Sequence, residues 1–412
     1  MTPIKTRLAD AADALAGELE ALSHRIHAHP ELGFKEVQAS GWLADFLAAQ
    51  GFKVERGVAG VDTAFRATIE TGAGPTIAIL CEYDALPGIG HACGHNVIAA
   101  AGAGAGAALA AVRDALPAGR IQVIGTPAEE GGGGKVKLIE GGVFQDVDCA
   151  MMVHGFDRNV LHQNLLGYAG AAFEWRGKAA HASADPWAGV NALDACIQTF
   201  NAIAMLRQQM RPDCRIHGII TDGGAAANVI PERAAASFAV RAPSIADMWA
   251  LYERVVACAE GAARATGTEI EVHPQDVVYE PMDSNGVPLD LFADNMRALG
   301  LTIDEPVADR TASSDIGNVS QIIPTIHPWI AIAPQGMAIH TREFLDSAVS
   351  PLARAGLLAG AKAMAMTTVD LLANPALVAR ARAGLLAGAK AMAMTTLDLL
   401  ANPALVARAG PR

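Results

Sequence analysis

Residues 76–96 read TIAILCEYDALPGIGHACGHN, and their pattern indicates the fold class. It opens with an apolar run at 76–80, which predicts a short buried strand. Acidic residues, histidines and a cysteine follow directly, and the uncharged, Ala- and Gly-rich run at 97–112 then predicts a buried helix. A strand, a polar loop and a helix in this order indicate part of a βαβ unit, in which ligand sites collect at the carboxyl ends of strands.

The same rhythm continues on both sides of this stretch. Residues 39–50 have the pattern of an amphipathic helix that stops at Gly51, and residues 119–125, 149–153 and 329–333 read as further apolar strands. Polar groups follow these strands too, at Thr126 to Glu130 and at His154. We therefore predict an α/β fold with a mixed, mostly parallel sheet and helices on both faces.

The pattern changes near residue 168. Strands are predicted at 171–177, 216–222, 235–241 and 268–272, with helices over 190–210 and 245–266, which together make a compact α+β insertion. The first pattern returns after residue 284. The sequence thus predicts a main domain at 1–167 and 284–380 that is interrupted by a smaller domain at 168–283.

The C-terminal part contains a near-perfect duplication. Residues 353–380 and 381–408 differ only at Val369 and Leu397. Repeat architectures need at least three units and tolerate drift, so two almost identical copies indicate a recent duplication. We expect one copy to complete the fold as its last helix, and the duplicated helical segment at 381–412 to be surplus.

Composition excludes several classes of protein. The chain has 412 residues, enough for two domains, and a net charge of −12, which argues against a nucleic-acid partner. Its N-terminal 20 residues lack the apolar core of a secretory signal, and the run at 97–112 is shorter than the roughly 18 residues of a membrane span. Six widely spread cysteines are no disulfide framework, so we expect a cytoplasmic enzyme without a membrane partner.

The densest chemical signal is the pair Cys93 and His95. Residues at this spacing can converge on one ion where the backbone turns, and thiolate and imidazole suit zinc or a similar divalent cation. A Cys that binds such an ion is a thiolate with a lowered pKa. The spacing alone is a weak signal, and its alternative is a buried Cys beside a surface His.

Three further signals are modest by themselves. Glu129 and Glu130 are adjacent, so one carboxylate can bind a metal while the other faces a water molecule; the alternative is a solvated acidic turn. His154 follows an apolar strand and His340 is similarly placed, although a single His there is more often a satisfied core residue. Together with Cys93 and His95 these side chains are enough donors for two ions.

These residues also carry a family resemblance. The relevant motifs are HAHPELG at 27–33, YDALP at 83–87, HACGH at 91–95, PAEE at 127–130, His154, GKAAH at 177–181 and HTREF at 340–344. The chain resembles the aminoacylase/carboxypeptidase family of di-metal peptidases, in the branch of auxin-conjugate hydrolases and aminobenzoyl-glutamate hydrolases. The stretches CEYDALP at 81–87, GHN at 94–96 and SSDIGNVS at 313–320 are most similar to the subgroup with β-alanyl dipeptidases.

The resemblance implies a role for each matching residue. The implied ligands of two divalent ions (Zn, Mn or Co) are Cys93 as the bridge, His95, Glu130, His154 and His340. Glu129 would be the general base. His181, on the smaller domain, would reach the active site of a neighbouring subunit and help to hold the oxyanion.

The smaller domain would accordingly serve as a lid and as the dimerisation surface of a homodimer or higher homo-oligomer. Asn228 and Arg241 are weaker matches, for contacts to the substrate carboxylate. Asp84 would orient a metal ligand from behind. The role of Glu82 stays open between ligand, support of a ligand and simple structure, because many relatives have a different acidic pair here.

Other departures and matches carry less weight. Many relatives have Asp where this chain has Asn96. His29, His91 and His327 are interpreted as structural or supporting residues.

The resemblance implies hydrolysis of an amide bond in a small molecule, namely an N-acyl or N-aminoacyl amino acid or a dipeptide with a free carboxylate. The alternatives are deacetylation of an N-acetyl amino acid, and a binding protein on the same fold with a decayed site.

Overall fold

The computed structural model describes residues 1–307 and 310–385, and the chain divides into two compact units. The first contains Met1–Gln163, Asp283–Arg310 and the described residues from Asn318 onward. The second contains Asn164–Met282 and Thr311–Gly317. Each unit has its own hydrophobic core, as expected for a chain of this length.

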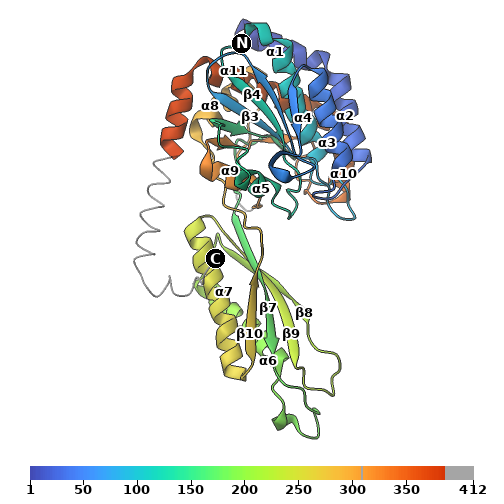
Figure 1. The fold of residues 1–412 in the computed structure, drawn as a ribbon, viewed down its shortest axis with the longest axis vertical. Coiled ribbons are helices and arrows are strands. Elements are labelled where there is room, and N and C mark those ends of the chain that lie inside the picture. Colours follow the sequence, from blue (N-terminus) through green and yellow to red (C-terminus); the bar gives the residue numbers. More distant parts are fainter. Residues whose placement is uncertain (308–309, 386–412) are drawn as a thin grey trace. The chain divides into compact units, whose positions relative to one another are not determined.

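The first unit is built around a six-stranded sheet with the order β1-β2-β4-β3-β5-β11. Its paired strands β3 and β4 are labelled in Figure 1. The strands are β1 (Lys53–Arg56), β2 (Phe65–Glu70), β3 (Thr76–Cys81), β4 (Arg120–Gly125), β5 (Cys149–Met151) and β11 (Thr325–Ile326). The pairs β4–β3, β3–β5 and β5–β11 are parallel, whereas β1–β2 and β2–β4 are antiparallel. The predicted α/β fold with a mixed, mostly parallel sheet is confirmed.

The expected strand at 149–153 is shorter than predicted. β5 ends at Met151, and His154–Phe156 forms a separate strand, β6, which pairs in parallel with β12 (Trp329–Ala331). His154 therefore lies within a strand and not just after one. The strands β1 and β2 were absent from the prediction, although β2 alternates buried and less buried side chains as a strand with one covered face does.

Helices surround this sheet. They are α1 (Pro3–Ala14), α2 (Ala16–Ala28), α3 (Val37–Ala49), α4 (His95–Ala111), α5 (Gly134–Glu140), α8 (Gly286–Ala298), most of α9 (Ile316–Ile322), α10 (Arg342–Ser347) and α11 (Pro351–Ala373). α11 is long and apolar enough to cross a membrane, but 72% of its most apolar window is buried in the fold. This burial is what a core helix requires, because α11 packs along α4.

Three glycines allow α4 to pack closely against its neighbours. A Cβ atom at Gly102 would lie 2.5 Å from Cys81 Sγ on β3, and one at Gly106 would lie 2.6 Å from Val123 Cγ2 on β4. A Cβ atom at Gly104, toward the helices, would lie 2.7 Å from Leu19 Cδ1. Since α4 begins at His95, this packing also holds the start of the helix in place.

The second unit is a four-stranded antiparallel sheet with two helices. The strand order is β10-β7-β9-β8, formed by β7 (Gly167–Arg176), β8 (Arg215–Asp222), β9 (Arg233–Ala242) and β10 (Glu269–Pro274). The helices α6 (Ala192–Leu206) and α7 (Ile245–Thr266) pack on it around Trp175 and Phe238. The bounds of α7 are those predicted from its amphipathic pattern.

The first copy of the duplicated segment supplies α11 and the start of a further helix at 375–385. The expectation that the second copy is surplus stays a prediction, but its first residues pack on the fold. Ala381 is 1% exposed and accepts a hydrogen bond from Asn285 Nδ2 at 3.0 Å, and Arg382 pairs with Asp148. Residues 386–412, the rest of the predicted segment, lie outside the described residues.

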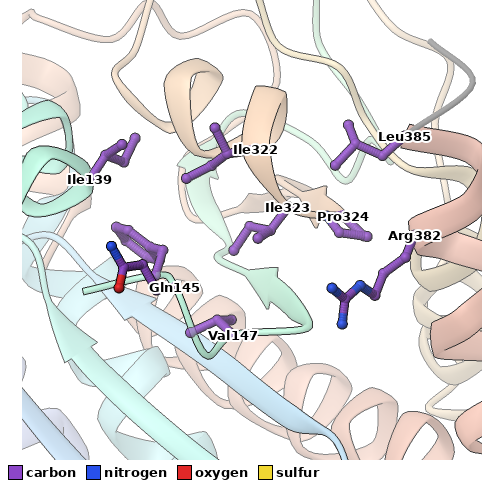
Figure 2. A pocket seen from close by; sticks show the side chains of 9 residues that line it. Ile139, Gln145, Val147, Ile322, Ile323, Pro324, Arg382 and Leu385 are labelled. Atoms are coloured by element: carbon purple, nitrogen blue, oxygen red, sulfur yellow. The ribbon is translucent and has the colours of Figure 1, made fainter. Parts of the chain in front are cut away.

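Arg382 and Leu385 also line a pocket of about 300 Å³ (Figure 2). Its other walls come from the segment around α5 and from the end of α9; they are Ile139, Phe144, Gln145, Val147, Ile322, Ile323 and Pro324. None of the candidate ligands lines this pocket. The pocket is therefore separate from the candidate site described next.

Candidate metal centre

His95 is held at the carboxyl end of β3. It is the first residue of α4, follows Gly94 in the left-handed conformation, and is fully buried. Its Nδ1 lies 2.9 Å from the backbone oxygen of Asp84 and 3.1 Å from Asp84 Oδ1. Nδ1 is thus the nitrogen that donates to Asp84, and Nε2 is left to bind another group, the arrangement typical of a metal-ligating His.

The charges of this pair stabilise each other. Burial opposes ionisation of Asp84, but His95 outweighs burial and lowers the pKa of the carboxyl. Burial also opposes the charged form of His95, yet Cys93 and Asp84 hold the pKa of the imidazole well above its usual value. The surroundings of His95 therefore favour positive charge, which a divalent cation can supply.

His154 approaches from the neighbouring strand β6. Its Nδ1 donates to Gly155 O at 2.7 Å, and its Nε2 lies 3.5 Å from Cys93 Sγ. Burial lowers the pKa of His154 to about 4, so the ring is neutral and Nε2 carries a lone pair. Trp329 stacks on the ring with 4.5 Å between centroids, which fixes its plane.

When no metal ion is bound, Cys93 is a buried thiol. Burial, followed by the charge of Glu130, raises the pKa of Cys93 well above its usual value. The expected low-pKa thiolate thus applies only to the metal-bound form, and metal binding must displace the proton.

The loop after β4 presents Glu129 and Glu130 in a strained turn. Ala128 has a positive φ of 58°, and its N–H donates to Glu36 Oε1 at 2.8 Å. A Cβ atom at Gly134 would lie 1.7 Å from Pro127 O, so the loop can fold back only with glycine there. This close approach requires the last of the four glycines, and Gly131 and Gly133 have the positive φ that favours glycine.

The two adjacent carboxylates both point toward His95. Glu130 Oε1 is 3.9 Å and Glu129 Oε2 is 4.0 Å from His95 Nε2. His340, whose φ is 64°, brings its Nε2 to 3.5 Å from Glu130 Oε1. Burial opposes ionisation of Glu130, but His340 and His95 outweigh it and lower the pKa of the carboxyl.

These side chains fit a pair of metal ions. The donor atoms of Cys93, His95 and His154 lie within 4.8 Å of one another, and so do those of Cys93, Glu130 and His340. His95 Nε2 and Glu130 Oε1 are buried and have no hydrogen-bond partner among the described residues. Buried polar atoms without partners are costly, and donors aimed at one point are what a cation requires.

The structure brings six of the predicted site residues together in the first unit. These are Cys93, His95, Glu129, Glu130, His154 and His340. Asp84 lies behind His95, with its Oδ1 3.1 Å from His95 Nδ1.

The remaining predicted residues lie in the second unit. His181 is exposed, with Ser183 Oγ 3.2 Å from its Nδ1, and Asn228 is exposed beside it, with its O accepting from Ala182 N. Arg241 is half-buried, donates to Ser313 Oγ at 2.6 Å and lies over the ring of Tyr168.

Other polar residues have local partners. Asn96 is fully buried and its Nδ2 donates to Ser23 Oγ and to Ala348 O, so it ties α4 to its neighbours. His29 is exposed, whereas His91 and His327 are buried with no hydrogen-bond partner for either ring nitrogen among the described residues.

Three residues at the site were not predicted. Trp329 stacks on His154, Glu36 supports the loop of the carboxylates, and Lys135 is a fully buried cation that pairs with Glu82. No spacing rule would have found them. A Lys placed just after four glycines carries no periodic signal in the sequence.

Known proteins resemble this chain over most of its length. The Xaa-Arg dipeptidase of Mus musculus is 38% identical over 390 residues, which cover 91% of this chain and 90% of the relative. A subunit of the p-aminobenzoyl-glutamate hydrolase of Escherichia coli is 29% identical over 447 residues, with 90% of this chain and 92% of the relative covered.

Solved structures share the fold. A putative aminohydrolase from methicillin-resistant Staphylococcus aureus has a TM-score of 0.78 at 23% identity, covering 89% of this chain and 100% of that one. The YXEP protein of Bacillus subtilis, a dinuclear metal-binding peptidase, has a TM-score of 0.71 at 22% identity, with 87% and 99% covered. Peptidase family M20/M25/M40 matches residues 78–367. The chain therefore belongs to the M20/M25/M40 peptidase family and is a hydrolase of amide bonds.

Proposed function

We propose that this hydrolase uses two divalent ions to cleave an amide bond next to a free carboxylate, in a dipeptide or in an N-acyl or N-aminoacyl amino acid. The observation that carries the proposal is the convergence of a thiol, three imidazoles and two carboxylates in one unit. Their chemistry suits Zn, Mn or Co.

Cys93 is the proposed bridge between the ions, since its Sγ belongs to both groups of donors. His95 and His154 would complete one site, and Glu130 and His340 the other. His340 has a side chain that is 45% exposed, so its side of the centre is open to solvent. This opening is where a substrate and a water molecule could enter.

The proposed chemistry gives the two adjacent carboxylates different roles. Bound ions would polarise the scissile carbonyl and lower the pKa of an attacking water. Glu129, 8% exposed, would take the proton of that water and pass it to the leaving nitrogen. Its Oε2 lies 4.0 Å from His95 Nε2, at the margin of the donor cluster, where a base for such a water is needed.

The second unit would supply the remaining contacts. His181 is proposed to hold the oxyanion in the active site of a partner subunit, and Asn228 and Arg241 to bind the substrate carboxylate. Arg241 is suited to this because Ser313 and Tyr168 already fix its guanidinium.

An exposed sheet edge supports a homodimer. β8 lies at one end of the second sheet, with Ile219 and Ile220 65% and 46% exposed. β10, at the opposite edge, carries Glu269, Glu271 and His273 instead. Charged edges resist pairing with another chain and apolar edges invite it, so β8 is the proposed dimerisation edge.

The names of the relatives reduce the range of candidate substrates. The Xaa-Arg dipeptidases of mouse and human are 38% and 36% identical to this chain, which favours a dipeptide as substrate. The substrate of the p-aminobenzoyl-glutamate hydrolase is the second candidate. Deacetylation of an N-acetyl amino acid stays an alternative, whereas a decayed, non-catalytic site is disfavoured because no expected donor is missing. A cytoplasmic location is inferred from six free cysteines.

The test is hydrolysis of an amide panel by chelator-stripped protein, with and without added Zn, Mn or Co. The panel contains Xaa-Arg and β-alanyl dipeptides, N-acetyl amino acids, indoleacetyl-amino acids and aminobenzoyl-glutamate. Metal-restored cleavage of a dipeptide supports the proposal, and cleavage of another member reassigns the substrate. No cleavage by protein that holds two ions would refute the proposed substrate class.

A further inference from the structure

A buried ion pair lies beside the proposed metal centre and has no part in the chemistry described so far. Glu82 follows β3 directly, Lys135 lies in the first turn of α5, and neither side chain is more than 1% exposed. Lys135 Nζ donates to Glu82 Oε1. Such a pair seldom adds stability by itself, because taking both charges out of water costs about as much as their attraction returns.

The second oxygen of Glu82 indicates what the pair does. Glu82 Oε2 is buried and has no hydrogen-bond partner among the described residues, and the same is true of His95 Nε2. These two atoms lie 3.6 Å apart, closer than His95 Nε2 is to either Glu130 or Glu129. Two buried polar atoms that can both ligate a cation therefore face each other in the interior without a hydrogen bond.

A cation between them would satisfy both. Ligands of one ion that are each about 2.0–2.2 Å from it lie roughly 3–3.5 Å from each other. The observed 3.6 Å between Glu82 Oε2 and His95 Nε2 needs only a small adjustment to reach this range. No such geometry would be needed if Glu82 served only to neutralise Lys135.

We propose that Glu82 is a sixth protein ligand of the metal pair, which donates Oε2 to the ion bound by His95, and that Lys135 positions it through Oε1. This inference rests on the two-metal function proposed above. By holding one oxygen, Lys135 leaves Glu82 a single oxygen for the ion. Lys135 also gives the carboxylate a partner before the metal binds.

The test is the paired substitution Glu82→Gln with Lys135→Met, which removes both charges of the ion pair. Zinc content is measured by elemental analysis after dialysis against a weak chelator, and the cobalt-substituted protein is examined by absorption spectroscopy. The matched control is Lys5→Met with Asp370→Asn, an ion pair of 2.7 Å in the same unit. The control should keep both ions and an unchanged cobalt spectrum.

We expect the Glu82/Lys135 variant to hold one of two ions with at least tenfold lower affinity, in the range of about 10–100-fold for disturbed metal sites. Its cobalt ligand-field bands should shift, while the charge-transfer band of Cys93 stays. Wild-type affinity for both ions with an unchanged spectrum would overturn the assignment.

If the paired variant does not fold, Glu82→Asp tests the assignment instead. The shorter side chain keeps a carboxylate for Lys135 but no longer reaches the ion. Unchanged affinity in this variant would overturn the assignment equally. A wild-type protein that holds fewer than two ions would instead refute the two-metal function itself, so the two failures are distinguishable.

Discussion

Asp84 holds His95 through two of its own oxygens, because Oδ1 and the backbone carbonyl lie 3.1 and 2.9 Å from the same imidazole Nδ1. Asp84→Asn should weaken metal binding by about 10–100-fold. The amide of Asn can donate to His95 Nδ1, and the imidazole proton would then be on Nε2, the nitrogen that binds the metal. Competition with a coloured chelator measures this. Asp146→Asn, which removes a carboxylate paired with Arg120, is the control and should bind as the wild type does.

Substitution of Glu129 and of Glu130 should have different effects, because their proposed roles differ. Glu129→Gln is expected to keep both ions and to lose about 10²–10⁴-fold in kcat, as for loss of a general base. Glu130→Gln should lose metal first, and activity with it. Metal content and turnover are measured on the same samples. Retained turnover in Glu129→Gln would remove Glu129 as the base.

His181 is predicted to act across subunits. His181→Ala should lower kcat by roughly 10²–10³-fold, the range for loss of one oxyanion donor. Mixing it with Glu129→Gln should restore part of the activity, because one site of a mixed dimer would then have both residues. Subunit exchange is verified by mass spectrometry of differently tagged chains. Exchange without rescue would indicate that His181 acts within its own subunit.

Glu36 should make stability depend on pH. Burial raises its pKa from 4.5 to about 7. The folded protein therefore binds this proton more tightly than the unfolded chain, so stability falls as pH rises between these two values. Glu36→Gln should remove on the order of 1–3 kcal/mol of this dependence. Urea unfolding of both chelator-treated proteins from about pH 4.5 to 8 measures it, and parallel stability curves would contradict it.

Two truncations should differ in stability. Deleting residues 381–412 removes Ala381 and Arg382 together with one wall of the pocket of about 300 Å³. Deleting 386–412 keeps these contacts. The longer deletion should be less stable by about 1–3 kcal/mol, through a lost hydrogen bond and exposed apolar surface. Thermal unfolding compares them, and equal Tm values would show that these contacts contribute nothing.

Much of the architecture could be predicted from the sequence because strands and helices leave different apolar periods. The strands at 76–80 and 119–125 and the helix at 245–266 match β3, β4 and α7 closely. Polar residues after parallel strands were expected to meet at one edge, and Glu130 and His95, which follow β4 and β3, lie together. His154 joins them from within β6. The break between β5 and β6 leaves no such trace, since Met152 and Val153 are as apolar as a continuous strand would be.

The supporting residues could not be predicted because their roles depend on tertiary contacts alone. Lys135 follows Glu82 by 53 positions, and Glu36 precedes Ala128 by 92. A buried Lys is uncommon enough that the sequence favours an exposed one. Its pairing with Glu82 is visible only once α5 is packed against the end of β3.

The close packing of α4 has an evolutionary consequence. Gly102, Gly104 and Gly106 each leave no room for a methyl group, so nearly every mutation at these positions would push against β3, β4 or α2. A shift of the helix would displace His95 at its first turn. Lineages that inherit this scaffold have little freedom to vary it, and adaptation to a new substrate must draw on segments away from the donor atoms, among them the second unit.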